Sequence, residues 1–441
     1  MKKHWIRVTL ATAFAIATTG APSAFAVNWI TSTGMEEPGA VPWRLFGFAS
    51  VEYQRTGGSV LPAGNPFAGK PNALNQIGPE LEESSLIQIP YVRAGVRGSL
   101  FDGKLNYFFA PLAGYNGLTR LGGGAAIKIT DASLTLNLIP NARIRLGQFK
   151  HPSGEEASQE PQYQVFVNPT DTTSQLLQER FFDSDGTPVN NANKDNGPAS
   201  GIRDIGVQLF DAIRVGEWEH TYAVMLGQGN GILRGDNNSG KDLYLFWSSE
   251  WVFDGRGPKR EGLKGYAFYQ DGERTLRTGA AQIEGDFDRT RWGIGATFKK
   301  GFWYAAGEYV EADGMIPAGS SAIAVPGTLS NNNQQVARYL MRPDDEANGY
   351  NFTVGYAIRP NWELFARYNR LNRATDTADF ERRLETWSLS TRYYFSKDIY
   401  AVASYEWRDF RAPQLAASSV ANTSLDTVDD RLGLRLYWIF F

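Results

Sequence analysis

The sequence predicts an all-β protein: a transmembrane, antiparallel, up-and-down β-barrel of sixteen strands. Three observations lead to this fold class. The apolar segments alternate with a period of two. Each segment is close to the ~9–11 residues that a tilted strand needs to cross a bilayer. The connections alternate strictly between short and long, as they do in barrels with short turns at one rim and long loops at the other.

The N-terminus reads as a cleaved signal peptide over residues 1–26. Lys2, Lys3 and Arg7 form a positive start, and an apolar stretch follows them. Residues 24–26 then read Ala-Phe-Ala, a small-x-small cleavage site. The alternative is a membrane anchor, for which the apolar stretch is short. We therefore expect an exported chain.

After cleavage the chain divides into two parts. Residues 27–42 are expected to form a periplasmic N-terminal segment, and residues 43–441 the transmembrane barrel. Beyond the signal peptide, the one long charge-free run, 315–337, is interrupted by proline and filled with Ser and Asn, so it reads as a loop. We expect the mature protein in the bacterial outer membrane.

The strands are read from alternation along the chain. Between Trp387 and Phe395, for example, apolar residues alternate with Ser388, Ser390 and Arg392. The same rule gives the sixteen predicted strands 43–54, 86–100, 104–115, 125–138, 142–150, 202–213, 217–228, 241–253, 262–271, 289–300, 302–312, 349–359, 361–372, 383–395, 399–410 and 429–441.

A soluble β-sandwich also has short alternating strands, but it gives no reason to sort loops by length or to place aromatics at strand ends. Aromatic rings favour the membrane interface. Rings near the predicted ends are Trp43, Tyr53, Tyr107, Trp218, Trp251, Trp292, Trp303, Tyr350, Trp362, Tyr400 and Trp407. The chain also ends on Phe441, as outer-membrane barrels do.

The longest connection, 151–201, is the third long loop, and we expect it to fold into the lumen as a constriction. A sixteen-strand ring is wide enough for water, because side chains fill only smaller barrels. The apolar run 163–167 would be costly to leave in water. The alternative is an extracellular lid. The expected constriction-loop acids are Glu155, Glu156, Glu160 and Asp171.

Several strands place basic residues on the inward parity. An arginine facing lipid near the midplane costs ~2–4 kcal/mol, so the lumen is the favoured place. Guanidinium groups bind carboxylates and phosphates in a bidentate way, which favours anions. The expected pore-lining, anion-contacting residues are Arg93, Arg97, Arg143, Arg145, Lys150, Arg203, Arg367, Arg392 and Arg435. Inward acids offer the alternative of a balanced wall; they are Glu52, Asp131, Glu308, Glu363 and Glu406.

Composition excludes several other functions. The chain has no cysteine, which excludes disulfides, zinc ribbons, iron–sulfur clusters and thiol catalysis. A net charge of −3 argues against a nucleic-acid partner. The mature histidines are His151 and His220, and neither a Gly-x-Ser-x-Gly nor a His-Glu-x-x-His motif occurs. We expect no catalytic site, no metal and no cofactor.

The segment 143–152, Arg-Ile-Arg-Leu-Gly-Gln-Phe-Lys-His-Pro, with Gly154-Glu155 after it, resembles the phosphate-selective porin O and P family. The likeness continues in residues 178–180 (Gln-Glu-Arg) and 203–209. The resemblance implies an outer-membrane homotrimer in which each subunit is a pore. It also implies that basic residues lead anions to a constriction; the best-matched positions are Arg143, Arg145 and Lys150.

The leading hypothesis is therefore a porin for passive diffusion of small hydrophilic solutes or inorganic anions, favouring phosphate-like anions and embedded in outer-membrane lipid. One alternative is a general, unselective porin. A second is a conduit that docks a partner protein such as a cytochrome, and a third is an outer-membrane enzyme. Each alternative makes a different use of the lumen, so the contents of the lumen decide among them.

Overall fold

The structure is a computed structural model of the chain. It describes residues 28–37, 39–65, 68–69, 72–75, 85–114, 120–121, 124–125, 127–179, 182–186, 201–232, 235–255, 260–318, 325–328, 335–338 and 340–440. The predicted signal peptide, residues 1–26, lies outside the described residues, as does Phe441. No helix in the described ranges is long and apolar enough to span a membrane.

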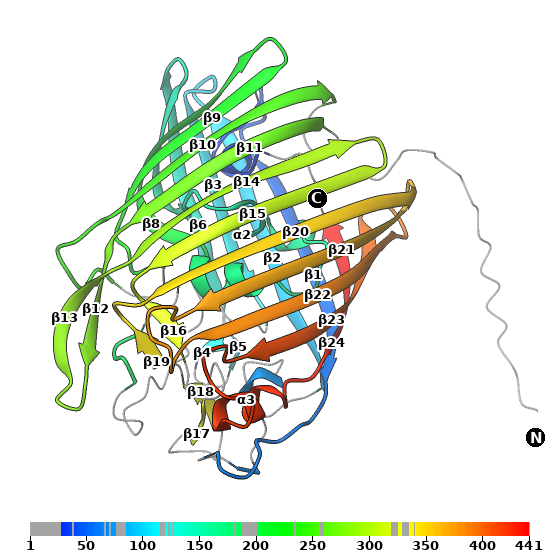
Figure 1. The fold of residues 1–441 in the computed structure, drawn as a ribbon. Coiled ribbons are helices and arrows are strands. Elements are labelled where there is room, and N and C mark those ends of the chain that lie inside the picture. The colour runs from blue at the N-terminus through cyan, green and yellow to red at the C-terminus, as the bar shows by residue number, and fades with distance from the viewer. Residues whose placement is uncertain are drawn as a thin grey trace, which may run out of the picture.

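Sixteen strands form one closed antiparallel barrel, which confirms the predicted fold class (Figure 1). Every predicted strand is present, with its ends within three residues of the expected ones. The barrel strands are β1 (Arg44–Thr56), β2 (Ser85–Leu100), β3 (Leu105–Ala113), β6 (Lys128–Ile139), β7 (Ala142–Lys150), β8 (Arg203–Val215), β9 (Trp218–Gly227), β10 (Asp242–Asp254), β11 (Glu261–Asp271), β14 (Thr290–Lys300), β15 (Trp303–Asp313), β20 (Glu346–Arg359), β21 (Trp362–Arg373), β22 (Arg382–Tyr394), β23 (Ile399–Arg411) and β24 (Arg431–Phe440).

The first and last strands close the barrel. β1 pairs with β24 in an unbroken register from Gly47 opposite Phe440 to Thr56 opposite Arg431. Closure leaves no unpaired sheet edge, which is the condition for strands to span hydrocarbon. The seam therefore joins residues from the two ends of the chain.

Alternation along each strand separates an outer apolar face from the lumen. On β24, Leu434, Leu436 and Trp438 are exposed, whereas Arg435 and Tyr437 between them are buried. This is the period-two pattern expected of a strand with lipid on one side and a polar interior on the other. One aromatic expected in the interface belt departs from it. Tyr400 on β23 is buried and donates a hydrogen bond to the carbonyl of Gln162 in the long loop.

Short elements lie in the long loops (Figure 1). Four two-stranded sheets occur there among the described residues, together with the helix α3 (Val420–Leu425) and the 3-10 turn η1 (Ala73–Asn75). The paired strands are β4 (Arg120–Leu121) with β5 (Gly124–Ala125), β12 (Glu273–Thr278) with β13 (Ile283–Asp288), β16 (Ile316–Ala318) with β19 (Leu340–Arg342), and β17 (Val325–Thr328) with β18 (Gln335–Arg338).

The long loop after β7 runs inside the barrel, as predicted. It holds α2 (Glu155–Ser158), the 3-10 turn η2 (Pro161–Tyr163) and the π-helical turn η3 (Thr173–Leu177). Its apolar residues Leu176 and Leu177 are fully buried against Val310 and Leu371 on the inner face of the barrel. The apolar core of the molecule therefore lies within the lumen, between the loop and the strands.

The N-terminal segment contains the short helix α1 (Trp29–Ser32). Trp29 and Ile30 are buried, and residues 28–36 contact inward-facing side chains of β2, β7 and β9. We expected residues 27–42 as a periplasmic segment. Residues 28–36 of this segment lie against the inner wall of the barrel, whereas Val41, just before β1, is 54% exposed.

Candidate functional site: the lumen and its constriction loop

A buried cluster of charges fixes the start of the long loop. Arg93 on β2 pairs with Asp131 on β6 (Nη2–Oδ2, 2.5 Å) and with Glu160 of the loop. Arg203 on β8 reaches Asp131 (3.2 Å), and Lys150 at the end of β7 reaches Glu160 (3.2 Å). Burial alone would raise the pKa of Glu160, but Arg93, Lys150 and Arg203 outweigh it and lower this pKa to about 2. Three of the predicted anion contacts are thus bound to acids of the protein.

Another predicted arginine, Arg367, lies across the lumen from this cluster. Arg367 on β21 binds Glu156 of the loop (Nη1–Oε1, 2.6 Å) and the carbonyl of Asn168 (3.0 Å). Its guanidinium also lies 4.0 Å from the ring centroid of Phe166. These contacts tie the middle of the loop to β21.

Two further arginines pair within the barrel strands near the seam. Arg392 on β22 donates from Nε to Glu363 on β21 at 2.7 Å. Arg435 on β24 pairs with Glu52 on β1 and donates to the loop carbonyl of Val167 at 2.8 Å. Both guanidinium groups are buried, so neither presents a free charge to the lumen.

The last three predicted arginines lie on the N-terminal side of the lumen. Arg97 pairs with Glu36 of the N-terminal segment, and Arg143 pairs with Asp211 on β8. Arg145 differs: among the described residues no carboxylate lies within salt-bridge distance of it. Its Nη2 donates to the carbonyl of Thr33 (3.1 Å), so a backbone dipole replaces the acid.

The acids of the long loop, like the arginines, form hydrogen bonds and ion pairs with other residues of the protein. Glu155 accepts from Lys264 on β11 (2.5 Å) and from the indole of Trp29 (2.7 Å). Asp171 accepts from Thr386 (3.3 Å), and burial raises the pKa of Asp171. With Glu156 and Glu160 above, all four predicted constriction-loop acids contact inward-facing side chains of the barrel.

Gly154 lies where the loop packs against Glu308 on β15. Glu308 on β15 accepts the backbone N–H of Glu155 at 2.8 Å and the hydroxyl of Tyr266 at 2.7 Å. A Cβ on Gly154 would lie 2.2 Å from Glu308 Oε2, so any other residue here would require the Glu308 carboxylate to move. The Gly154-Glu155 pair in the sequence marks this contact.

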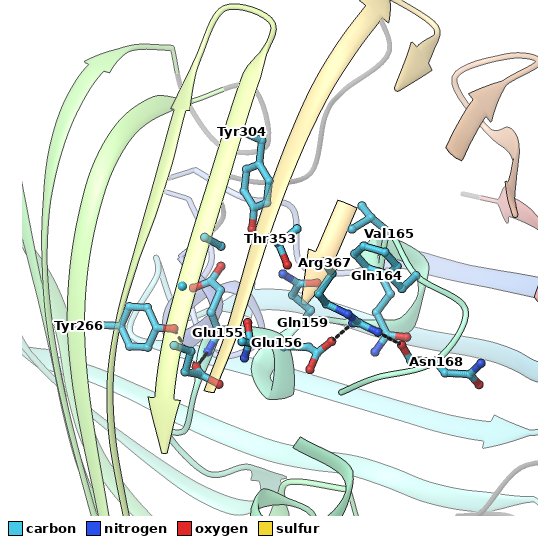
Figure 2. A pocket seen from close by; sticks show the side chains of 15 residues that line it. Glu155, Glu156, Gln159, Gln164, Val165, Asn168, Tyr266, Tyr304, Thr353 and Arg367 are labelled. Carbon is cyan, nitrogen blue, oxygen red and sulfur yellow. Dashed lines mark hydrogen bonds and ion pairs between the residues drawn. The ribbon is translucent and has the colours of Figure 1, made fainter. Parts of the chain in front are cut away.

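A gap lies between the loop and the strands β11, β15, β20 and β21. Figure 2 shows the residues that line it, with Glu156 of the loop bonded to Arg367 and with Glu155 near Tyr266. The gap encloses about 530 Å³ of empty space, continuous with solvent. Its lining mixes carboxylate, amide, hydroxyl and aromatic groups, which suits hydrated polar solutes more than apolar ones.

Sequence reasoning missed a second charge cluster at the end of the loop. Glu179 accepts from Arg274 on β12 (3.0 Å) and pairs with Arg289 (2.7 Å), while Arg274 also binds Asp242 on β10 (2.8 Å). Burial raises the pKa of Glu179, but the two arginines lower it to about 2. The triplet at 178–180 signalled a family likeness but gave no partner for Glu179.

It also missed Trp29 and Ile30. The available signal was an apolar pair directly after the predicted cleavage site, in a segment otherwise rich in small polar residues. His151, one of the two mature histidines, is buried and stacks on Tyr244 with ring centroids 4.4 Å apart. Burial lowers the pKa of His151 to about 4, so it packs as a neutral side chain at pH 7.

A closed sixteen-strand barrel with an apolar outer face, a charged lumen and an inward loop defines an outer-membrane channel. The chain belongs to the Gram-negative porin family, whose profile matches residues 92–413. The protein is therefore a porin of the outer membrane, in a family of channels for passive diffusion.

Solved structures show the same fold. OmpF of Salmonella typhi in complex with daunomycin is 14% identical, with a TM-score of 0.55 over 90% of this chain and 97% of that one. An anion-selective porin from Comamonas acidovorans is 12% identical, with a TM-score of 0.51 over 91% and 100%. At these identities the likeness shows the fold alone. No curated protein sequence matches the chain.

Proposed function

We propose that this porin is a weakly selective pore for small hydrophilic solutes and ions, which pass through the gap between the long loop and β15, β20 and β21. One observation carries the proposal. Eight of the nine basic residues expected to attract anions are paired with acids. Paired opposite charges cancel at a distance, so they cannot build a strong anion-attracting field.

The charges that line the gap support the same conclusion. Glu156 is matched by Arg367, and Glu155 by Lys264. Glu308 accepts hydrogen bonds from a hydroxyl and a backbone N–H. A passage with matched charges along most of its lining rejects neither ion strongly.

Anion preference is the second candidate, and a different observation favours it. Around Asp131 and Glu160 the bases Arg93, Lys150 and Arg203 outnumber the two acids. This local excess lies beside the segment 143–152, which resembles the phosphate-selective porin O and P family. Phosphate-like anions are the solutes that such a surplus would favour.

A conduit that sheathes a partner protein receives less support. The long loop and residues 28–36 occupy the lumen and bond to inward side chains of the strands. A protein partner would have to displace both. The homotrimer implied by the family resemblance remains a proposal; chemical cross-linking of the protein in native outer membranes would test it.

Planar bilayers test the proposed function. We expect single-channel steps from the purified protein and a reversal potential near zero under a KCl gradient. A chloride-selective current that low millimolar phosphate blocks would instead favour the second candidate. A folded, inserted protein without conductance would overturn both.

A further inference from the structure

The N-terminal segment 28–36 is bonded across one side of the lumen. At its start, the amide of Asn28 donates to Glu219 Oε1 (3.0 Å) and Thr221 Oγ1 (2.6 Å) on β9. The next apolar side chain, Ile30, is buried in a cluster with Phe210 on β8 and Ala223 on β9. The helix α1 therefore rests on the inner face of these two strands.

Arginines from two other strands hold the rest of the segment by its backbone. Arg97 on β2 donates to the carbonyls of Ser32 and Met35, each at 2.9 Å. Arg145 on β7 donates to the carbonyl of Thr33 at 3.1 Å. The segment thus reaches from β9 to β2. Arg145 has no acid partner in the described residues, and the segment supplies it with the carbonyl of Thr33 as an acceptor.

The segment also braces the constriction loop. The Trp29 indole donates to Glu155 Oε1 at 2.7 Å, and its ring lies 5.6 Å from that of Tyr163. Glu155 is held from its other side by Lys264 on β11 (2.5 Å). Because Glu155 lines the gap, Trp29 fixes one side of the passage without lining that passage itself.

Between the segment and the strands β9 to β11 a smaller space remains, with about 330 Å³ of empty volume. Its lining includes Asn28, Glu219, Glu250 and Lys264, so its wall is polar except for Trp29, Ile30 and Phe246. Removing the segment would merge this space with the volume that α1 now fills. A polar cavity of that size fills with water.

We infer that residues 28–36 form a resident plug that closes the β2–β9 side of the lumen and confines diffusion to the gap beside Arg367. Trp29 acts as a positioning residue, since it sets the place of Glu155. The inference rests on the diffusion function proposed above and deepens it. It makes the N-terminal segment, together with the long loop, the element that sets the size limit for solutes.

The plug is held by side-chain contacts and not by its own helix. A helix of four residues is far below the ~12–15 that isolated helices need. Its placement therefore depends on the contacts of Asn28, Trp29 and Ile30 and on the two arginines. Changes at these few positions should release it, while the strand pairing of the barrel stays intact.

Two variants test the plug in planar bilayers and in liposome-swelling assays with sugars of increasing size. One is a deletion of residues 28–36, and the other is Trp29→Ala. For the deletion we expect conductance to rise by about two-fold, because a second aqueous path opens beside the first, and larger sugars should enter. Trp29→Ala should give a smaller rise with more current noise. Trp43→Ala is the matched control, since Trp43 precedes β1 and is 65% exposed.

A reversible tether covers the case in which the deletion fails to insert. The chain has no cysteine, so Asn28→Cys with Thr221→Cys, whose native side chains touch, places one thiol pair at the plug. In a Trp29→Ala background, a short bifunctional methanethiosulfonate should restore the low conductance of the unmodified protein. Dithiothreitol should then reverse the effect.

The outcomes separate the two proposals. If the unmodified protein forms no channels, the diffusion function fails. If it conducts, and neither the deletion nor tethering and release of the segment changes conductance or sugar size limit, the plug is refuted and the diffusion function stands.

Discussion

Arg367 and Glu156 bind each other at 2.6 Å and join strand β21 to the long loop at the edge of the diffusion gap. The Arg367 side chain is 3% exposed and the Glu156 side chain 19%, so the pair is largely shielded from water. An arginine in this setting holds a loop in place, and its charge is balanced where solutes pass. The same pairing recurs around the lumen, and it is the reason that a wall rich in arginine does not imply a strong anion preference.

Glu156→Gln should move ion selectivity toward chloride. The substitution leaves Glu406, 3.9 Å away, as the remaining acid beside Arg367, so the positive charge of Arg367 is less well balanced at the edge of the gap. One charge a few ångströms from a passing ion is worth on the order of 1 kcal/mol, or about a five-fold change in permeability ratio. The reversal potential under a KCl gradient measures it. Glu311→Gln is the control: it lies on β15 at a position of outward parity, bonded to Tyr309, and should leave the potential unchanged.

Glu160→Gln should loosen the start of the long loop. The cluster would then hold three bases, Arg93, Lys150 and Arg203, and a single acid, Asp131. Removing one partner of a buried pair typically costs about 3–5 kcal/mol. We expect faster proteolysis of the loop in the folded barrel and a broader distribution of conductance steps. Asp183→Asn, which breaks an exposed pair with Arg277, should cause neither change, because exposed pairs contribute little.

Acid should release the same loop in a defined range. The pKa of Glu160 is lowered to about 2 in the folded protein, against an ordinary value of about 4.3. A lowered carboxyl pKa stabilises the fold fully above the ordinary value, and that stabilisation is lost as the pH falls through the folded pKa. Conductance should therefore be steady down to about pH 4.5 and should become unstable toward about pH 2.

The Glu160→Gln variant isolates this group, because its conductance is already broadened at neutral pH and should respond less to acid over the same range. Glu179, whose pKa is also lowered to about 2, titrates alongside it in both proteins. If the variant and the unmodified protein show the same acid response, the loop is not held by Glu160.

The barrel should cross the membrane with its short turns in the periplasm. Lys397→Cys puts a thiol in the short turn between β22 and β23, and Ser239→Cys puts one in the long loop between β9 and β10. Both positions are exposed. A membrane-impermeant maleimide added to intact cells should label Ser239→Cys and spare Lys397→Cys until the outer membrane is opened. The reverse pattern would invert the topology.

One part of the constriction could be predicted from the sequence. The apolar residues of 163–167 would be costly to leave in water, and this favoured an inward loop over an extracellular lid. In the structure Val165 and Phe166 are buried against Tyr304 on β15 and Phe365 on β21. What the loop touches was not readable, because a loop has no period that fixes its side-chain directions.

By itself the sequence determined the strands and their order, and it favoured the inward course of the long loop. A strand between lipid and water must alternate at every second residue, and this leaves a local pattern that can be read without knowing any neighbour. Tertiary structure alone decided how the charges combine. Arg435 and Glu52 stand 383 positions apart and meet because β24 closes the barrel against β1. It also decided that Trp29 lies beside Glu155, because a four-residue helix takes its place from the side chains around it and not from its own sequence.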